Sequence, residues 1–217
     1  MIAGDVFGNL RPVTGWRLVG DARAVPGERK LECSGEGRVL VNVTPGQKGG
    51  APYLYSLRDY GDAAVHVEFM VPHTSNSGVY LMGRYEVQIL DSFGKQELKY
   101  GDLGGIYQRI DAADPARKRG YEGTPPRRNV ARAPGEWQTM DITFRAPRFD
   151  AAGRKTENAR FLRVVVNGVT VQENVEVTGP TQAHPLDGEV TAGPVAIQGN
   201  HGPIAIRSFR VGARDFP

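Results

Sequence analysis

Apolar and polar residues alternate along much of this chain of 217 residues. In the run WQTMDITFRA, residues 137–146, every second side chain from Met140 to Phe144 is apolar and those between them are polar or charged. Neighbouring side chains of a β-strand point to opposite faces, so this alternation predicts a strand with one buried face. No segment of useful length carries apolar residues at helical spacing. The chain is therefore expected to be all-β with little helix.

Glycine and proline divide the chain into short runs that alternate in this way or are rich in Val, Ile, Phe and Tyr. Such a rhythm is typical of all-β domains. The strand candidates are 38–43, 63–71, 77–90, 137–146, 159–177, 193–199 and 203–212. Within the fifth, Asn167 and Gly168 lie between two β-branched runs, and they predict a tight hairpin because both residues tolerate positive φ.

Two segments without a strand pattern, 92–136 and 178–192, are expected to form long loops. Ordered loops of this length in a compact domain are usually functional. No fixed repeat and no Ser/Gly/Pro linker divides the chain. The expected architecture is one domain over residues 1–217, with two packed antiparallel sheets, one of them curved; a barrel fits the pattern less well.

The composition is that of a soluble globular chain, with 40% hydrophobic residues and no apolar run near the roughly 18 residues of a membrane span. The formal net charge is +3, and segment 109–132 alone has seven Lys and Arg against three acids. This segment lacks the interleaved aromatic residues of a nucleic-acid surface, so no such partner is expected. Cys33, the one cysteine, cannot form an internal disulfide. The oligomeric state stays open.

The run GRYEVQILDS, residues 83–92, combines an apolar strand face with a row of polar and charged residues. With a period of two, the apolar face consists of Tyr85, Val87 and Ile89, which are expected to face the core. The other face carries Arg84, Glu86 and Gln88. A solvent-facing strand would also carry polar residues, so the row alone does not establish a site.

The run NSGVYLMGRYEVQILDSFG, residues 76–94, resembles the 3-keto-disaccharide hydrolase domain family. The similarity continues through 104–108, 125–150, 164–181 and 193–211, and so covers nearly the whole chain. The resemblance implies an all-β, two-sheet antiparallel jelly-roll sandwich of the concanavalin or laminin-G type, with long loops. It also implies a carbohydrate substrate oxidised to a ketone at C3, whose glycosidic bond is cleaved.

Members of this family are typically exported bacterial proteins, so the resemblance implies a periplasmic or extracellular location. The first ten residues lack a basic region followed by an apolar stretch, so the sequence shows no signal peptide. A cytoplasmic location stays open. The chain departs from the family's usual pattern at Ser208, where an Asn is common, and at Asn200, where an acid or another polar residue is common.

The chemistry of such a substrate assigns roles to the polar row. A ketone at C3 acidifies the proton on C2, so a base can remove that proton and the resulting enolate can expel the oxygen on C1. In this hypothesis Glu86 is the base, Arg84 stabilises the enolate or orients the sugar, and Gln88 binds a hydroxyl group.

Asp91 offers a rival mechanism. An unbroken strand would place it on the face opposite Glu86, but a bulge near Leu90 would bring the two carboxylates together. A conventional two-carboxylate hydrolysis would then compete with elimination. Asp91 has a structural interpretation as well, since Asp commonly initiates turns such as the one expected at SFG.

Further candidates come from the last strands and the long loop. His201, in GNHGP, titrates near neutrality and can act as acid or base. The expected sugar-binding residues, besides Arg84 and Gln88, are Tyr107, Gln198, Asn200 and Arg207. Of these, Tyr107 could stack on a pyranose ring.

No metal site is evident. His66 and Glu68 share a strand face, but no third ligand accompanies them, and they are interpreted as residues of the sheet surface. No cofactor is expected, although the sequence leaves assistance by a divalent cation open. Trp16 and Trp137 lie beside apolar strand residues, which favours core packing over sugar stacking.

Two functions are weighed. The first is an enzyme that cleaves 3-keto-glycosides, and the second is a non-catalytic carbohydrate-binding module on the same fold. A binding module needs no charged base, so the row of Arg, Glu and Gln favours the enzyme. An interaction domain without a sugar ligand would leave that row without a role.

Overall fold

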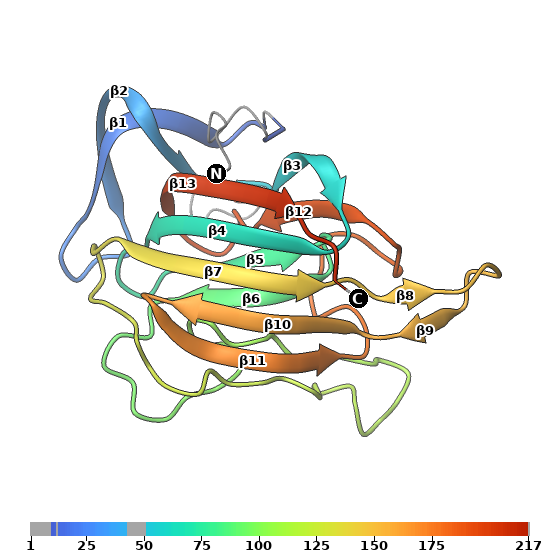
Figure 1. The fold of residues 1–217 in the computed structure, drawn as a ribbon. Coiled ribbons are helices and arrows are strands. Elements are labelled where there is room, and N and C mark those ends of the chain that lie inside the picture. Colours follow the sequence, from blue (N-terminus) through green and yellow to red (C-terminus); the bar gives the residue numbers. More distant parts are fainter. Residues whose placement is uncertain (1–9, 12, 43–50, 217) are drawn as a thin grey trace.

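The computed structural model describes residues 10, 11, 13–42 and 51–216. In this part of the chain, two antiparallel sheets pack face to face (Figure 1). The larger sheet has the order β1 (Trp16–Ala24), β2 (Leu31–Asn42), β13 (Ala205–Ala213), β4 (Ala63–Met70), β7 (Gln138–Arg145), β10 (Ala159–Val166) and β11 (Val169–Val177). The smaller sheet has the order β3 (Leu54–Tyr60), β12 (Gly193–Ile197), β5 (Asn76–Leu81) and β6 (Tyr85–Leu90). A short ribbon joins β8 (Arg148–Phe149) to β9 (Lys155–Glu157).

The expected two-sheet antiparallel sandwich is confirmed, and each strand candidate contains a strand. The hairpin at Asn167 and Gly168 is confirmed too, with φ of 51° and 80°. The candidate 77–90 is two strands, because a turn at 82–84 separates β5 from β6. The sequence pattern missed β1 and β3, which lie at sheet edges and expose much of their length, so few apolar positions mark them.

The main core lies between the two sheets. It combines apolar side chains of β4, β7 and β10 with those of β5, β6 and β12. Tyr85, Val87 and Ile89 are fully buried in it, which confirms the register expected for β6. The opposite face of β6 therefore carries Glu86 and Gln88. No helix that could span a membrane occurs in the described part of the chain.

A second apolar cluster covers the other face of the larger sheet, near β1 and β2. Its buried members are Val19, Ala22, Val41, Met70 and Ala205. Trp137 packs against this cluster, and Trp16 packs against the main core. The core-packing interpretation of both tryptophans is confirmed.

The two long segments without a strand pattern flank β6. Residues 104–107 lie along the free edge of β6. The backbone N–H of Gln88 donates to the Gly105 carbonyl at 2.9 Å, and the backbone N–H of Tyr107 donates to the backbone carbonyl of Glu86 at 3.2 Å. The second segment contacts the start of β6 through Thr181, whose hydroxyl accepts a hydrogen bond from the Glu86 amide at 3.1 Å. Figure 1 shows the first segment, green to yellow, looping beneath the sheets.

Candidate functional site

A small pocket opens on the face of the four-stranded sheet that points away from the core. We call it the inner pocket, and its volume is about 40 Å³. Strands β5 and β6, with Gln198 just after β12, form its floor, and the neighbouring loops form its walls. It is lined by Asn76, Tyr80, Glu86, Gln88, Tyr107, Ala183, Gln198 and His201.

The register of β5 against β6 explains how Glu86 fits into this floor. Tyr80 is directly opposite Glu86, and Gly78 is opposite Gln88, on the same face. A Cβ atom at Gly78 would overlap the Oε1 atom of Glu86. Gly78 is therefore the position that leaves room for the carboxyl group, and any larger residue would displace it.

The Glu86 carboxyl is the central ionisable group of the pocket. Its residue is only 2% exposed, and this burial raises the pKa of Glu86 to about 8, against the smaller, lowering effect of a hydrogen bond from the Tyr80 hydroxyl. Among the described residues, no Lys, Arg or His lies within ion-pair distance of it. Glu86 therefore holds its proton at neutral pH.

The direction of each hydrogen bond at Gln198 can be deduced from its neighbours. The Tyr53 hydroxyl donates to the Ala183 carbonyl at 3.2 Å, and the Tyr80 hydroxyl donates to Glu86. Both phenol oxygens are thus left to accept, and the Gln198 amide nitrogen lies 3.3 Å from each. This fixes the orientation of the amide and leaves the Gln198 Oε1 atom buried without a hydrogen-bond partner in the described structure.

Gln88 repeats this arrangement on β6. Its amide nitrogen donates to the Asn76 Oδ1 atom at 2.7 Å, and its own Oε1 atom is buried and unpaired in the part of the chain described. Buried polar atoms are rarely left without a partner, so two such acceptors in one pocket call for hydrogen-bond donors from a ligand or water. The inner pocket is therefore built to receive donors.

His201 lies at the rim, in the connection between β12 and β13. Its Nδ1 atom is 2.7 Å from the Asn200 Oδ1 atom, so Nδ1 carries the proton and donates, and the Nε2 atom of the neutral ring keeps its lone pair. Partial burial and the nearby Arg29 lower the pKa of His201. Asn200 itself is exposed and does not line the pocket.

Tyr107 forms one wall of the pocket. Its ring packs edge-on against Tyr100, with 5.3 Å between the ring centroids. Burial and the proximity of Glu86 raise the pKa of the Tyr107 phenol, so the hydroxyl keeps its proton and remains a donor. Five residues singled out from the sequence thus meet at one place, namely Glu86, Gln88, Tyr107, Gln198 and His201.

Arg84 does not share the face of Glu86, and this expectation was wrong. Strand β6 begins at Tyr85, so Arg84 belongs to the preceding turn. Its guanidinium donates to the carbonyls of Met82 at 2.6 Å and Asp187 at 2.7 Å, and also to that of Gly188. Arg84 therefore fastens the segment 178–192 rather than facing the pocket.

The bulge near Leu90 that the two-carboxylate mechanism requires is not formed. The pairing of β5 with β6 is continuous from Leu81 opposite Tyr85 to Asn76 opposite Leu90. The Asp91 carboxylate accepts hydrogen bonds from the Thr74 amide at 2.9 Å and the Phe93 amide at 3.3 Å, so it fixes a turn. The two carboxylates are not brought together, and the structural interpretation of Asp91 is the one that the geometry supports.

Arg207 lies on β13 of the other sheet, so the structure does not bring it together with the expected sugar-binding residues that line the inner pocket. It forms an ion pair with Glu68, and its guanidinium carbon lies 4.4 Å from the ring centroid of Trp137. His66 contacts Asp141 at 2.7 Å. No group of three metal-ligating side chains occurs among the residues described.

Three further residues, Tyr53, Tyr80 and Asn76, fix the polarity of the pocket. Neither tyrosine was expected from the sequence, and for Asn76 the sequence left a turn and a site role equally open. Tyr80 alternates with Gly78 and Asn76 along β5, which was the only signal available. That signal gains meaning only when β5 is known to pair with β6 on one side and with β12 on the other.

Solved structures support the fold. Three of them come from Parabacteroides distasonis ATCC 8503, and each bears the name "putative glycosyl hydrolase". One is 24% identical with a TM-score of 0.61, and the match covers 93% of this chain and 79% of that one. Another is 18% identical with a TM-score of 0.54, over 92% and 99% of the two chains. At these identities the similarity concerns the fold alone.

No match was found among curated proteins. The family comparison covers nearly the whole chain, as the resemblance of the sequence motifs implied. Residues 8–212 match the model of the 3-keto-alpha-glucoside-1,2-lyase-like domain, and the chain belongs to this family.

Proposed function

We propose that this protein cleaves the glycosidic bond of 3-keto-glucosides by elimination across the C1–C2 bond. The family's 1,2-lyase-like description supports this reaction. The observation that carries the proposal is a pair of ionisable groups in the inner pocket whose pKa values move in opposite directions, up for Glu86 and down for His201. Such pairs provide an acid and a base at the same pH.

The directions of the two pKa shifts support a division of roles between Glu86 and His201. A protonated Glu86 cannot accept the C2 proton at neutral pH, whereas the neutral ring of His201 can take it on Nε2. The C2–H electrons form an enolate with the C3 ketone, and the enolate then expels the C1 oxygen to give a C1=C2 double bond and regenerate the ketone. Glu86 gives its proton to the departing oxygen. Proton exchange with water restores both groups.

The remaining polar atoms suit the substrate's other groups. The hydroxyl of Tyr107 is a donor for the C3 oxygen, on which negative charge develops. The free oxygens of Gln88 and Gln198 are acceptors for the two hydroxyl groups that flank the ketone, on C2 and C4. The space of about 40 Å³ is near the volume of one water molecule, so only the reacting edge of the sugar enters it.

The decisive experiment compares a 3-keto-glucoside with its unoxidised parent in deuterated water, with products followed by NMR. Elimination requires the ketone, so the parent should remain intact. Addition of water to the product should place deuterium on C2. Cleavage of both compounds at equal rates would contradict elimination, and cleavage of neither would support the carbohydrate-binding module.

A matched pair of histidine variants tests the base. His201→Gln should lower turnover of the keto substrate by roughly 10²-fold, the usual scale of general-base catalysis. His73→Gln changes an exposed histidine outside the pocket and should retain activity. Equal activity of the two variants would exclude His201 as the base.

A further inference from the structure

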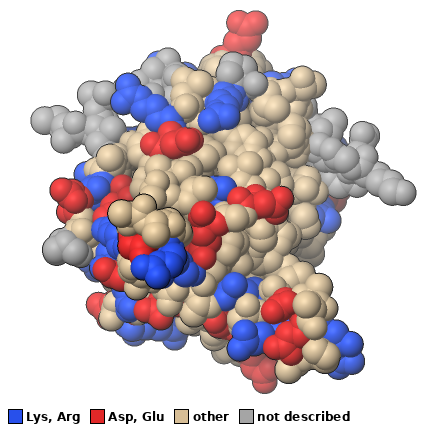
Figure 2. Space-filling model, turned by 90° about the vertical axis from the view of Figure 1, so that its right-hand side faces the viewer, with Lys and Arg blue, Asp and Glu red and all other residues tan. Residues whose placement is uncertain are grey.

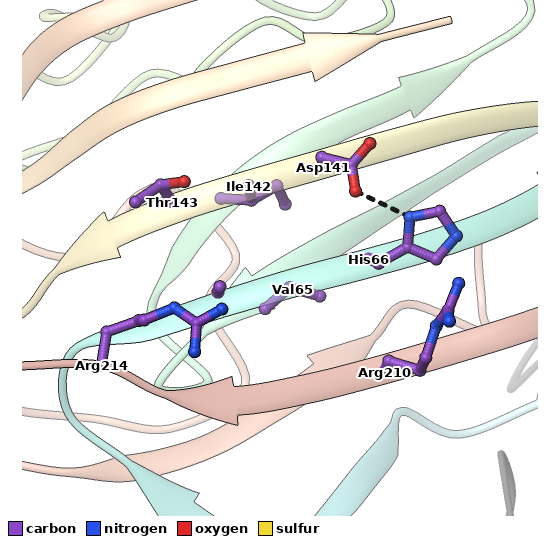
Figure 3. Close-up of a pocket in the computed structure, with 8 residues that line it drawn as sticks. Val65, His66, Asp141, Ile142, Thr143, Arg210 and Arg214 are labelled. Atoms are coloured by element: carbon purple, nitrogen blue, oxygen red, sulfur yellow. Dashed lines mark hydrogen bonds and ion pairs between the residues drawn. The ribbon is translucent and has the colours of Figure 1, made fainter. Parts of the chain in front are cut away.

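A wider depression lies on the opposite side of the molecule, on the face of the seven-stranded sheet that points away from the core. We call it the outer hollow; its volume is about 350 Å³, and it spans β13, β4 and β7 (Figure 3). The lining residues whose side chains point into the hollow from the outer face are Ala64, His66, Asp141, Thr143, Arg210 and Arg214. None of them belongs to the inner pocket.

Strand pairing explains why the sheet is hollowed there. Ala64 is directly opposite Gly212 on β13 and Thr143 on β7, so a row of three small residues, one of them without a side chain, crosses three strands. The next row on the same face consists of Arg210, His66 and Asp141, whose longer side chains form a wall. Arg214, just after β13, closes the other end.

The polar groups of the hollow are mostly hydrogen-bond donors. Arg210 and Arg214 are exposed, and neither has a carboxylate within ion-pair distance in the described structure. The Arg214 guanidinium donates only to the Ala213 carbonyl, at 3.3 Å, among the residues described. Glu68 is electrostatically influenced by Arg210 but forms its ion pair with Arg207. Figure 3 shows both guanidinium groups extending from the β13 side toward β4.

The one acid of the hollow is already engaged. Asp141 accepts from the Nδ1 atom of His66, as the dashed line in Figure 3 shows, at 2.7 Å. Neither arginine forms an ion pair with Asp141 in the described structure, so the hollow presents two unpaired guanidinium groups against one carboxylate. At the end of the molecule in Figure 2, by contrast, basic and acidic residues lie side by side. Among the described ion pairs, Arg154 pairs with Asp150 and Lys155 pairs with Glu189.

We propose that the outer hollow binds an anionic ligand of about monosaccharide size, such as a sugar that carries a carboxylate or a phosphate. Guanidinium groups match the planar or tetrahedral oxygens of these anions. The Thr143 hydroxyl and the apolar floor would contact the ligand's body. The volume of the outer hollow lies at the lower end of the range for small-molecule sites, roughly 300–1,000 Å³, and is well above what a bare ion needs. This inference does not depend on the proposed catalytic function.

The test measures binding of glucuronate, glucose 6-phosphate, methyl glucoside and inorganic phosphate by calorimetry and by amide shifts in NMR spectra. At least one charged sugar should bind saturably and shift the amides of Ala64 and Thr143, and its identity tells carboxylate from phosphate. Arg210→Gln and Arg214→Gln should each weaken this binding about tenfold, the loss expected for a hydrogen bond to a charged group.

Arg23→Gln is the matched control, because Arg23 is an exposed arginine on the edge strand β1 of the same sheet and pairs with Asp21 outside the hollow. It should change the affinity less than twofold, and all three variants should keep the wild-type melting temperature. The proposal is overturned if no charged sugar shifts those amides, if Arg23→Gln weakens binding as much as Arg210→Gln, or if methyl glucoside or inorganic phosphate binds as tightly as the charged sugars.

Discussion

The inner pocket and the outer hollow lie on the two outward faces of the same sandwich, yet they are opposites in size, burial and polarity. The pocket is about 40 Å³, its free polar atoms are mostly buried acceptors, and its carboxyl group is protonated. The hollow is about 350 Å³, and its free polar groups are exposed donors. A neutral sugar with hydroxyl groups suits the first region, and an anion suits the second.

The difference has a cause in the strands themselves. In the pocket, a single glycine, Gly78, accommodates a large carboxyl group, so the space is filled. In the hollow, Ala64, Gly212 and Thr143 face each other with no large side chain above them, so the space stays empty. Both arrangements use small residues on a sheet face, and the neighbouring rows decide which result follows.

The largest expected effect concerns Glu86. Glu86→Gln keeps the shape of the side chain but removes the transferable proton, so turnover of a 3-keto-glucoside should fall roughly 10²-fold or more. Binding of anions at the outer hollow should not change. Glu173→Gln, which alters an exposed glutamate paired with Arg127, is the control and should retain full turnover. Full activity of Glu86→Gln would remove this residue from the mechanism.

A second prediction tests the packing that positions the carboxyl group. In Gly78→Ala, the new methyl group overlaps the Glu86 carboxyl, so that group must move. The free energy of unfolding should fall by about 1–3 kcal/mol, as for other overpacked sites, and turnover should drop with it. Ala64→Gly, in the hollow, relieves no such overlap and should not alter turnover. Chemical denaturation and steady-state kinetics provide the two measurements.

The third prediction follows from the raised pKa of Glu86. In the unfolded chain this group titrates at its usual value near 4.5, whereas in the folded protein it holds its proton up to about pH 8. Between these values the folded state binds more protons, so this group's contribution makes stability fall as the pH rises. By pH 8 the contribution of Glu86 has lowered the free energy of unfolding by a few kcal/mol relative to its value below pH 4.5.

The comparison with Glu86→Gln isolates this contribution, because glutamine does not titrate. The variant should gain stability relative to the wild type as the pH rises from 5 to 8, as measured by urea denaturation at each pH. Parallel stability curves for the two proteins would show that Glu86 ionises normally in the fold.

The smallest effect is expected from salt, and it contrasts the two regions directly. Raising the salt concentration from low to about 0.5 M should weaken anion binding at the exposed arginines of the hollow several-fold, because ions screen surface charges. Binding of the keto-glucoside at the pocket relies on neutral hydrogen bonds and should change little. Equal salt dependence at both regions would contradict the assigned polarities.

Much of the sheet structure could be predicted from the sequence. Alternation in β4 and β7 marked one buried face, and Asn167 with Gly168 marked a hairpin. The edge strands β1 and β3 were not predicted, because they expose both polar and apolar residues. Alternation of apolar and polar residues marks a strand only when one of its faces is buried, and an edge strand buries less of its surface.

The candidate site was predicted less completely. A period of two correctly placed Glu86 and Gln88 on one face of β6. The same rule wrongly added Arg84, because Arg84 belongs to the turn at 82–84 that precedes the strand. The structure also leaves Asp91 and Arg207 outside the pocket, for a related reason. The Asp91 carboxylate accepts a hydrogen bond from the Thr74 amide, and Arg207 forms an ion pair with Glu68. These partners lie on other segments, so no local sequence pattern reveals them.

The sequence by itself determined which strand faces are apolar, where the tight hairpin turns, and the family to which the chain belongs. The tertiary structure alone decided that Glu86 keeps its proton, that Gln88 and Gln198 present unpaired oxygens, and that a hollow forms beside Arg210. The physical reason is that alternation is a local property of neighbouring residues. A pKa, an unpaired buried atom and a cavity each depend on contacts between strands far apart in the chain, as in the meeting of Tyr80, Glu86 and Gln198.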